Sequence, residues 1–206
     1  MGPHPPFQIG SKPLHKQPSL WVQTALSIAA ALILAVLLNL FVFQSYYVDG
    51  ESMSPTLHSD DRLIISKLER TANGLEGGPY IPVRGHIVVI DGKTSPQTES
   101  TAPHLIKRVI GLPGDRIVIA GGHVYIYNAE RPDGFDVDQE LGLDLGPTYT
   151  TTPLNVVVPE DSVFVLGDNR AEGGSYDSRS FGMVKSEYLQ GRLWARILPV
   201  SDGRVF

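Results

Sequence analysis

The sequence contains no cysteine in 206 residues. This absence excludes thiol catalysis, disulfide bonds and cysteine-ligated metal sites, although it does not identify a compartment. The net charge of −5 gives no basic excess that would favour nucleic acid as a partner. Three common catalytic patterns are also missing: Gly-x-Ser-x-Gly, Ser-x-x-Lys and the zinc-binding His-Glu-x-x-His. Any catalytic site in this chain must therefore follow a different sequence pattern.

Charged residues are absent from Gln17 to Val48, and Leu20–Phe43 is nearly all apolar. A helix rises 1.5 Å per residue, so this stretch can cross a hydrocarbon core of about 30 Å. A cleaved signal peptide has a shorter apolar core, roughly 7–15 residues, followed by small residues. Here Phe41-Val42-Phe43-Gln44 follows, and a buried helix of a soluble protein would be shorter or amphipathic. We predict an uncleaved transmembrane helix over residues 20–43.

The residues on either side of this helix predict its orientation. Residues 1–19 are rich in proline and contain Lys12 and Lys16, whereas Asp49 and Glu51 follow the helix. The positive-inside rule places the lysine-bearing tail in the cytoplasm and residues 44–206 on the outer or lumenal side. We expect a single-pass membrane protein with this orientation.

The rest of the chain has the composition of a β-rich domain. Glycine (21) and proline (16) are plentiful, and short runs rich in Val and Ile alternate with turns. Gly121-Gly122 predicts a tight hairpin, and the acidic segment Asn128–Pro153 predicts an inserted excursion. We expect loops over Thr71–Pro82 and Asp91–Pro103. The predicted strands are Arg62–Ser66, His86–Ile90, Leu105–Ile110, Arg116–Ala120, His123–Tyr127, Val156–Val158, Val163–Leu166 and Leu193–Ile197.

Ser52 is the first candidate for chemistry, because Gly50 and Pro55 flank it closely and would fix the backbone around its hydroxyl. The same residues are typical of an ordinary polar turn. A serine nucleophile needs a base, and Lys107 lies within an apolar strand whose burial would favour its neutral form. A lysine whose ammonium group reaches solvent fits the same pattern. A Ser-His-Asp triad also remains open, using His58, His86, His104 or His123.

A third segment follows the predicted strand Val163–Leu166. It begins with Gly167-Asp168-Asn169-Arg170 and continues to Ser175-Tyr176-Asp177-Ser178-Arg179. Opposed charges, glycines and hydroxyl groups are typical of a tightly hydrogen-bonded loop beside an active site. They are equally typical of a structural loop closed by ion pairs.

Three segments together resemble the type I signal peptidases, membrane-bound Ser-Lys endopeptidases. They are Ser52-Met53-Ser54-Pro55-Thr56-Leu57, Lys107-Arg108-Val109-Ile110-Gly111-Leu112-Pro113-Gly114-Asp115, and the segment from Gly167 to Arg179, which Phe181-Gly182-Met183-Val184 continues. Their order and spacing agree with that family. The resemblance implies a mostly antiparallel β catalytic domain with a small inserted lobe, preceded by one transmembrane helix. It also implies that this helix lies in a bacterial plasma membrane, or in an internal membrane such as a thylakoid.

The resemblance also implies roles for individual residues. Ser52 would be the nucleophile and Lys107 the general base. Ser175 would hydrogen bond and orient the lysine ammonium, although the loop that precedes it is longer than usual. Gly50 replaces a hydroxyl-bearing oxyanion residue, so the Ser52 amide would carry the oxyanion hole with a backbone contribution from Gly50. Four residues would support the site structurally, namely Arg108, Asp168, Asp177 and Arg179, and two would contact substrate, namely Met53 and Pro55.

The implied substrates are membrane-bound preproteins cut after small residues of the Ala-x-Ala type, near the export translocon and without a metal or organic cofactor. Two rival interpretations remain. A Ser-Lys self-cleaving regulator of the SOS-repressor type would be cytoplasmic and would carry a DNA-binding module, which the apolar helix and the acidic charge oppose. An anchored β-module that binds envelope peptides would not need Ser52 for its function.

Overall fold

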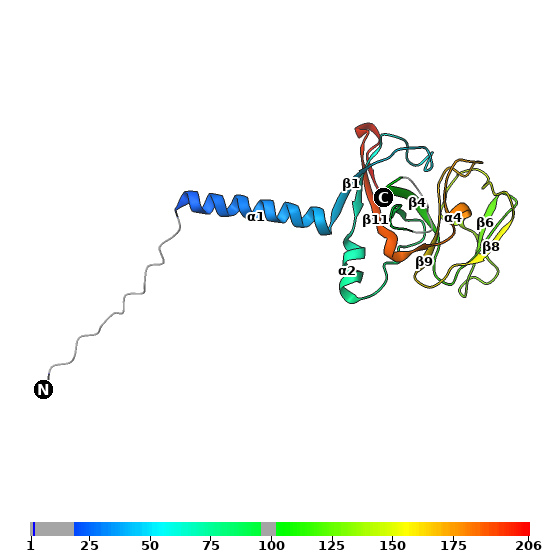
Figure 1. Ribbon diagram of the computed structural model, residues 1–206, viewed down its shortest axis with the longest axis horizontal. Coiled ribbons are helices and arrows are strands. Elements are labelled where there is room, and N and C mark those ends of the chain that lie inside the picture. Colours follow the sequence, from blue (N-terminus) through cyan, green and yellow to red (C-terminus); the bar gives the residue numbers. More distant parts are fainter. Residues whose placement is uncertain (1, 3–18, 96–101) are drawn as a thin grey trace. The chain divides into compact units, whose positions relative to one another are not determined.

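The computed structural model describes residues 2, 19–95 and 102–206 and divides them into two units, one ending at Leu37 and one beginning at Leu38. The predicted tail over residues 1–19 lies almost wholly outside the described residues, as do residues 96–101 of the predicted loop Asp91–Pro103. The first unit holds most of helix α1, Leu20–Phe41 (Figure 1). Leu20–Asn39 is long and apolar enough to cross a membrane.

The second unit is a β domain that contains two antiparallel sheets (Figure 1). The larger sheet has the strand order β1-β2-β11-β3-β4-β9-β10, and β12 pairs with β11. Its strands are β1 (Phe43–Tyr47), β2 (Arg62–Ser66), β3 (Ile87–Asp91), β4 (His104–Gly111), β9 (Ser162–Leu166), β10 (Val184–Lys185), β11 (Leu189–Leu198) and β12 (Arg204–Val205). The fold class expected from the sequence, mostly antiparallel β behind an apolar helix, is confirmed.

The smaller sheet has the order β7-β6-β5-β8 and is inserted between β4 and β9. Its strands are β5 (Arg116–Ala120), β6 (His123–Tyr127), β7 (Phe135–Asp136) and β8 (Leu154–Val157). The predicted hairpin at Gly121-Gly122 is confirmed, because Ala120 pairs with His123 and both glycines have positive φ. The excursion predicted over Asn128–Pro153 was too narrow, since β5 and β6 also belong to this lobe.

Short helices complete the domain. They are α2 (Leu68–Glu76), α3 (Val137–Glu140) and α4 (Ser178–Phe181), with 3₁₀ turns η1 (Ser186–Tyr188) and η2 (Val200–Asp202). Two predictions were wrong at this level. The loop expected over Thr71–Pro82 begins as helix α2, which ends at Gly77 in the left-handed conformation. The membrane helix expected to reach Phe43 ends at Phe41, and Phe43–Tyr47 forms strand β1 beside β2.

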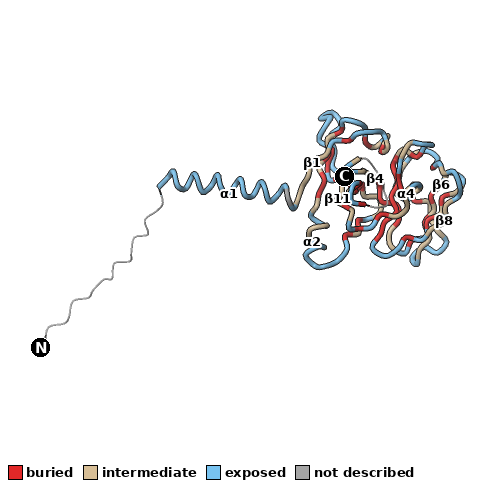
Figure 2. Tube along the Cα trace, viewed as in Figure 1, coloured by how far each residue is buried: buried red, intermediate tan, exposed pale blue. Residues whose placement is uncertain are grey.

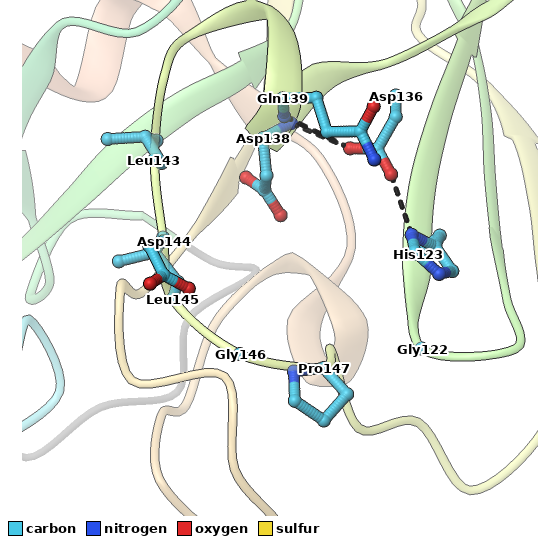
Figure 3. Close-up of a pocket in the computed structure, with 10 residues that line it drawn as sticks. All are labelled: Gly122, His123, Asp136, Asp138, Gln139, Leu143, Asp144, Leu145, Gly146 and Pro147. Carbon is cyan, nitrogen blue, oxygen red and sulfur yellow. Dashed lines mark hydrogen bonds and ion pairs between the residues drawn. The ribbon is translucent and has the colours of Figure 1, made fainter.

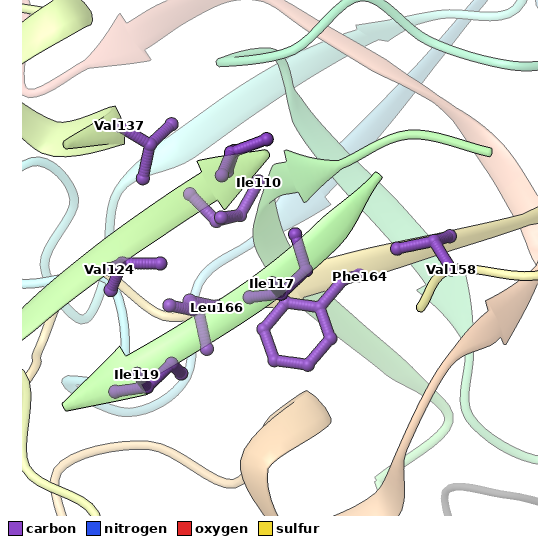
Figure 4. Close-up of a cluster of buried hydrophobic side chains, with 9 residues drawn as sticks. Ile110, Ile117, Ile119, Val124, Val137, Val158, Phe164 and Leu166 are labelled. Atoms are coloured by element: carbon purple, nitrogen blue, oxygen red, sulfur yellow. The ribbon is translucent and has the colours of Figure 1, made fainter. Parts of the chain in front are cut away.

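The core joins the two sheets and supports the site. Figure 2 places the buried segments along the strands of both sheets, and Figure 4 shows one buried cluster in detail. In that cluster Ile117 and Ile119 of the small sheet pack with Ile110, Phe164 and Leu166 of the large sheet. The inserted lobe is thus fixed against β4 and β9, the two strands that lead into the polar segments identified in the sequence.

Candidate active site

Ser52 lies in the turn between β1 and β2, and core packing holds this turn in place. The side chains of Met53 and Leu57 are fully buried in the cluster that includes Leu63 and Ile65 of β2. The amides of Thr56 and Leu57 both donate to the Met53 carbonyl, at 2.9 Å. The turn is therefore anchored on its apolar side, while Ser52 stays partly exposed on the other.

Lys107 reaches Ser52 from β4. Its Nζ lies 2.8 Å from Ser52 Oγ and also donates to the Ile106 carbonyl at 2.8 Å. The Lys107 residue is only 2% exposed, so its side chain does not extend into solvent. The alternative of a snorkelling surface lysine is therefore wrong. A buried amine in contact with a serine hydroxyl has the geometry of a nucleophile and its base.

Burial is the main cause that lowers the pKa of Lys107, to about 8. The negative charges of Asp177 and Asp168 oppose this shift, because they favour the protonated amine, and the Arg179 guanidinium reinforces it. A pKa near 8 gives a substantial neutral fraction of Lys107 at neutral to mildly alkaline pH. The same surroundings leave the ammonium form accessible for returning a proton.

Arg108, the neighbour of Lys107, forms a two-pronged ion pair with Asp168. Its Nε lies 2.7 Å from Asp168 Oδ1, and its second terminal nitrogen lies 2.5 Å from Oδ2. Thr56 Oγ1 donates to the same carboxylate at 2.5 Å, and Arg108 also donates to the Gly85 carbonyl. This buried pair thus connects β4, the loop after β9 and the Ser52 turn.

Asp177 and Arg179 form a second two-pronged pair, as the resemblance implied. Their closest atoms, Arg179 Nη2 and Asp177 Oδ2, lie 2.6 Å apart. Asp177 also accepts from the amide of Gly167 and caps α4 through the amide of Arg179. Arg179 in turn donates to the carbonyl of Tyr149 in the inserted segment. The pair braces the loop after β9, and its charges lie close enough to influence Lys107.

The loop after β9 is hydrogen-bonded directly to the Ser52 turn. The amide of Asn169 donates to the Ser52 carbonyl at 3.1 Å, and its side-chain amide donates to the Glu51 carbonyl at 3.2 Å. Gly167 sits so close that a Cβ atom there would lie 2.3 Å from the Ser52 carbonyl oxygen. No side chain larger than hydrogen fits at this point of contact.

Gly50 has φ of +102°, a conformation that glycine adopts without strain. Its amide does not face an open site, because it donates to Ser59 Oγ at 2.9 Å. The Ser52 amide, in contrast, has no acceptor among the described residues. The backbone contribution expected from Gly50 is thus already engaged, and the Ser52 amide is the donor left free for an oxyanion.

Ser175 does not make the hydrogen bond expected of it. Its Oγ is buried and has no hydrogen-bond partner in the described part of the chain. A Cβ on Gly167 would lie 2.2 Å from this oxygen, so Ser175 packs against the loop after β9. The carbonyl of Ile106 takes the place expected for Ser175 as a partner of the Lys107 ammonium.

An open groove of about 280 Å³ runs past Ser52 and Lys107. Its walls come from the end of β1 and the first half of β4, with Leu63 and Val89 beneath. The substrate contacts expected of Met53 and Pro55 are not part of this lining. Met53 is 0% exposed and belongs to the core under the turn, whereas Pro55 is exposed outside the groove.

Sequence reasoning missed two parts of this site. Thr56 was noted only as part of a motif, yet its hydroxyl bonds Asp168. Arg170 pairs with Asp138 of α3, at 2.6 and 2.7 Å, and also donates to Thr148 Oγ1. Thr56 and Arg170 both belong to motifs identified in the sequence. Their partners lie 112 and 32 positions away along the chain, and no local sequence pattern identifies a partner at that distance.

A second cavity of about 280 Å³ lies on the inserted lobe (Figure 3). Three of its acidic and imidazole side chains are already paired: His123 Nδ1 contacts Asp136 Oδ2 at 2.7 Å, Asp136 caps α3, and Asp138 binds Arg170. Among the described residues no three His, Asp or Glu side chains are placed to hold a metal ion. The groove at Ser52 is therefore the stronger candidate.

Comparisons with known proteins show which family the chain belongs to. The model of the family described as signal peptidase, peptidase S26, matches residues 21–198. The chain is 36% identical to a probable signal peptidase I-2 of Synechocystis over 180 residues, covering 87% of this chain and 74% of that protein. It is 32% identical to signal peptidase I P of Bacillus subtilis subsp. natto over 191 residues, covering 92% and 95%.

A solved signal peptidase I from Enterococcus faecalis superposes with a TM-score of 0.40 and 27% sequence identity, covering 55% of this chain and 97% of that one. The family assignment rests on the sequence matches, since the family model spans most of the chain. The protein belongs to the signal peptidase family, peptidase S26, and is a serine peptidase of the signal peptidase I type.

Proposed function

We propose that the protein is a membrane-anchored endopeptidase that removes signal peptides from exported preproteins, with Ser52 as nucleophile and Lys107 as general base. The observation that carries this proposal is the 2.8 Å contact between Lys107 Nζ and Ser52 Oγ at the edge of an open groove. Burial lowers the pKa of Lys107 to about 8, which suits a base near neutral pH.

Acylation would begin with neutral Lys107 taking the proton of Ser52 while Ser52 Oγ attacks the scissile carbonyl carbon. The negative charge then develops on the carbonyl oxygen, where the free Ser52 amide can donate a hydrogen bond. Such donors typically contribute about 3–4 kcal/mol to transition-state stabilisation. The lysine ammonium returns its proton to the leaving amine as the peptide bond breaks, which leaves an ester on Ser52.

Deacylation would reverse the same proton movements with water. Lys107, neutral again, takes a proton from a water molecule, and the resulting hydroxide attacks the ester carbonyl. The proton then passes from Lys107 to Ser52 Oγ as the ester bond breaks. Arg108, Asp168, Asp177 and Arg179 do not exchange protons in this scheme. They hold β4 and the loop after β9 in register with the Ser52 turn.

The groove suits an extended substrate. In the described part of the domain, the first half of β4, His104–Lys107, pairs with β3 on one side only, since β9 begins to pair at Arg108. Its open edge can take an added substrate strand through main-chain hydrogen bonds. The apolar floor of Leu63, Val89 and Ile106 would accept small side chains of an Ala-x-Ala site.

The anchor would bring enzyme and substrate together. We infer that α1 spans the membrane with the tail that carries Lys12 and Lys16 in the cytoplasm and the β domain on the outer or lumenal side. A preprotein's signal helix lies in the same bilayer, so its cleavage site would be presented at the surface where the domain begins. The enzyme would then lie near the translocon through which the preprotein is exported.

The test is cleavage of a preprotein with an Ala-x-Ala site, reconstituted with the enzyme in liposomes. We expect the native chain to cut after the last small residue, as read by mass spectrometry, and Ser52→Ala and Lys107→Ala to be inactive. Matched controls are Ser54→Ala, in the same turn, and Lys93→Ala, an exposed lysine. If the Lys107→Ala variant still cleaves the preprotein, Lys107 is not the general base and a histidine becomes the candidate. Peptide binding without cleavage by the native chain would favour the binding-module interpretation.

A further inference from the structure

One residue of the loop after β9, Asn169, holds the backbone on both sides of the nucleophile. Its backbone amide donates to the Ser52 carbonyl at 3.1 Å, and its side-chain Nδ2 donates to the Glu51 carbonyl at 3.2 Å. These carbonyls belong to the two peptide groups that meet at the Ser52 Cα atom. The described residues that line the groove include Ser52 and Lys107 but not Asn169, so any effect of Asn169 on the reaction passes through this backbone.

The side-chain hydrogen bond of Asn169 acts on the peptide group that contains the Ser52 amide. In a trans peptide group, the C=O of one residue and the N–H of the next lie in one plane and point in opposite directions. The Glu51–Ser52 bond is trans. A donor that holds the Glu51 carbonyl therefore directs the Ser52 N–H away from Asn169. This N–H has no acceptor among the described residues and is the proposed oxyanion donor.

The Glu51 carbonyl accepts two hydrogen bonds, and both strengthen the Ser52 N–H as a donor. The second comes from the Ser54 amide, at 3.1 Å, within the turn itself. Hydrogen bonds to the oxygen of a peptide group polarise it, which strengthens the hydrogen bond made by its N–H by about 10–30% for each bond. Asn169 thus orients and polarises the Ser52 N–H, while the Ser54 amide preserves part of both effects when Asn169 is lost.

The fold leaves the side chain of Asn169 little freedom. Its neighbours in sequence, Asp168 and Arg170, are both buried in ion pairs. A Cβ atom on Gly174 would overlap Asn169 Oδ1, so the absence of a side chain at position 174 provides the space for this amide. The donor to the Glu51 carbonyl is therefore in place before a substrate binds, as electrostatic stabilisation of a transition state requires.

We propose that Asn169 is a positioning residue for the oxyanion hole: its side-chain amide fixes and polarises the Glu51–Ser52 peptide group, whose N–H then meets the oxygen of the scissile carbonyl. The inference rests on the proposed function, in which Ser52 attacks a peptide carbonyl. Removal of an oxyanion donor typically costs about 100- to 1000-fold in kcat. Because the Ser54 amide remains, loss of the Asn169 side chain should cost less, about tenfold.

Steady-state cleavage of a peptide with an Ala-x-Ala site, by the full chain in detergent micelles, measures this cost. We expect Asn169→Ala to lower kcat about tenfold with little change in KM, because the interaction strengthens only in the transition state. Asn169→Asp keeps the shape of the side chain but replaces the donor with a carboxylate oxygen, so its loss should be at least as large. Asn155→Ala changes an exposed asparagine of β8 and should leave both constants unchanged.

A peptide aldehyde separates the oxyanion from the rest of the site. Ser52 Oγ adds to the aldehyde carbon, its proton passes to Lys107, and the aldehyde oxygen takes the negative charge beside the Ser52 N–H. We expect Asn169→Ala to weaken binding of the aldehyde by the same factor as kcat/KM. Binding of the uncleaved peptide, measured in the Ser52→Ala background, should not change. Equal weakening of both ligands would overturn the proposal, because it would indicate a purely structural role.

The contact itself can be measured without cleavage. A chain labelled with carbonyl carbon-13 in glutamate and nitrogen-15 in serine gives selected amide signals only from Glu-Ser pairs, which are Glu51–Ser52 and Glu99–Ser100. We expect the signal that disappears in Ser52→Ala to shift in Asn169→Ala and not in Asn155→Ala. An unshifted signal would overturn the contact, and an active native chain with an equally active Asn169→Ala variant would overturn this proposal alone. A native chain that neither cleaves the peptide nor binds the aldehyde more tightly would overturn the peptidase proposal as well.

Discussion

The ammonium nitrogen of Lys107 and the hydroxyl of Ser52 lie 2.8 Å apart although 55 positions separate the two residues. Strand β4 carries Lys107, and the turn between β1 and β2, which is anchored in the core, carries Ser52. The carbonyl of Ile106 holds the amine on its second side. This arrangement makes the protonation state of Lys107 the variable that controls the hydroxyl, and it leads to the predictions below.

The pH dependence of cleavage should follow Lys107. Because the neutral amine is the active form and its pKa is about 8, kcat/KM should rise about tenfold per pH unit below pH 8 and level off above it. The measurement is kcat/KM on a peptide with an Ala-x-Ala site across this range. Lys93→Ala should give the same profile. A midpoint near 6.5 would instead indicate a histidine base.

Lys107→Met should make the inactive protein more stable. The folded-state pKa of Lys107 is lowered from 10.5 to about 8, so the ammonium form costs the folded state about 3 kcal/mol at low pH. This cost is fully present below pH 8, shrinks as pH rises to 10.5 and is absent above it. The gain of Lys107→Met in the free energy of unfolding, measured with urea, should shrink over the same range. A gain that does not change with pH would contradict this origin.

Gly167→Ala should damage catalysis through contact with the nucleophile's own backbone. A Cβ at this position would lie 2.3 Å from the Ser52 carbonyl oxygen, so the turn must shift. A displacement of about 1 Å at a reacting group can cost about 100-fold in rate. We expect kcat to fall by at least that factor in steady-state assays. Gly78→Ala, where nothing lies within 4 Å, is the control and should be unaffected.

Loss of the Arg108–Asp168 ion pair should destabilise the fold more than loss of the hydrogen bond from Thr56 to Asp168. Asp168→Ala leaves the buried Arg108 guanidinium without a counter-charge, which typically costs about 3–5 kcal/mol. Thr56→Val removes a single hydrogen bond to the carboxylate and should cost about 1–2 kcal/mol. Urea unfolding of both variants gives the comparison. Equal losses would mean that the ion pair does not dominate this junction.

The sequence predicted those features that depend on composition or on a short motif. A long charge-free stretch identifies α1, and two adjacent glycines identify the β5–β6 hairpin. Ser52 and Lys107 were recognisable because their flanking residues follow a family pattern. The physical basis in each case is local: the length of an apolar helix, the backbone freedom of glycine, or the burial of a lysine in an apolar strand.

The remainder depends on contacts that no local pattern encodes. Strand β1 directly follows the apolar run of α1 in the sequence. Only the pairing of β1 with β2 shows where the helix ends and the strand begins. Helix α2 contains Thr71, Asn73 and Gly74, which are weak helix formers, and its hydrogen bonds to residues 39–42 supply what its propensity lacks. The packing of the loop after β9 places Asp168 beside the Thr56 hydroxyl and leaves the Ser175 hydroxyl against Gly167.

The central claim is that burial lowers the pKa of Lys107 enough for a catalytically useful fraction to be neutral beside Ser52 near physiological pH, and its titration by carbon-13 NMR tests this most directly. The full chain, labelled at the lysine Cε positions and held in detergent micelles, is titrated, with Lys107 assigned by comparison with Lys107→Met. The account predicts a midpoint near 8 for Lys107. A midpoint close to the ordinary value of 10.5 would contradict it, because a lysine that stays charged cannot take the Ser52 proton.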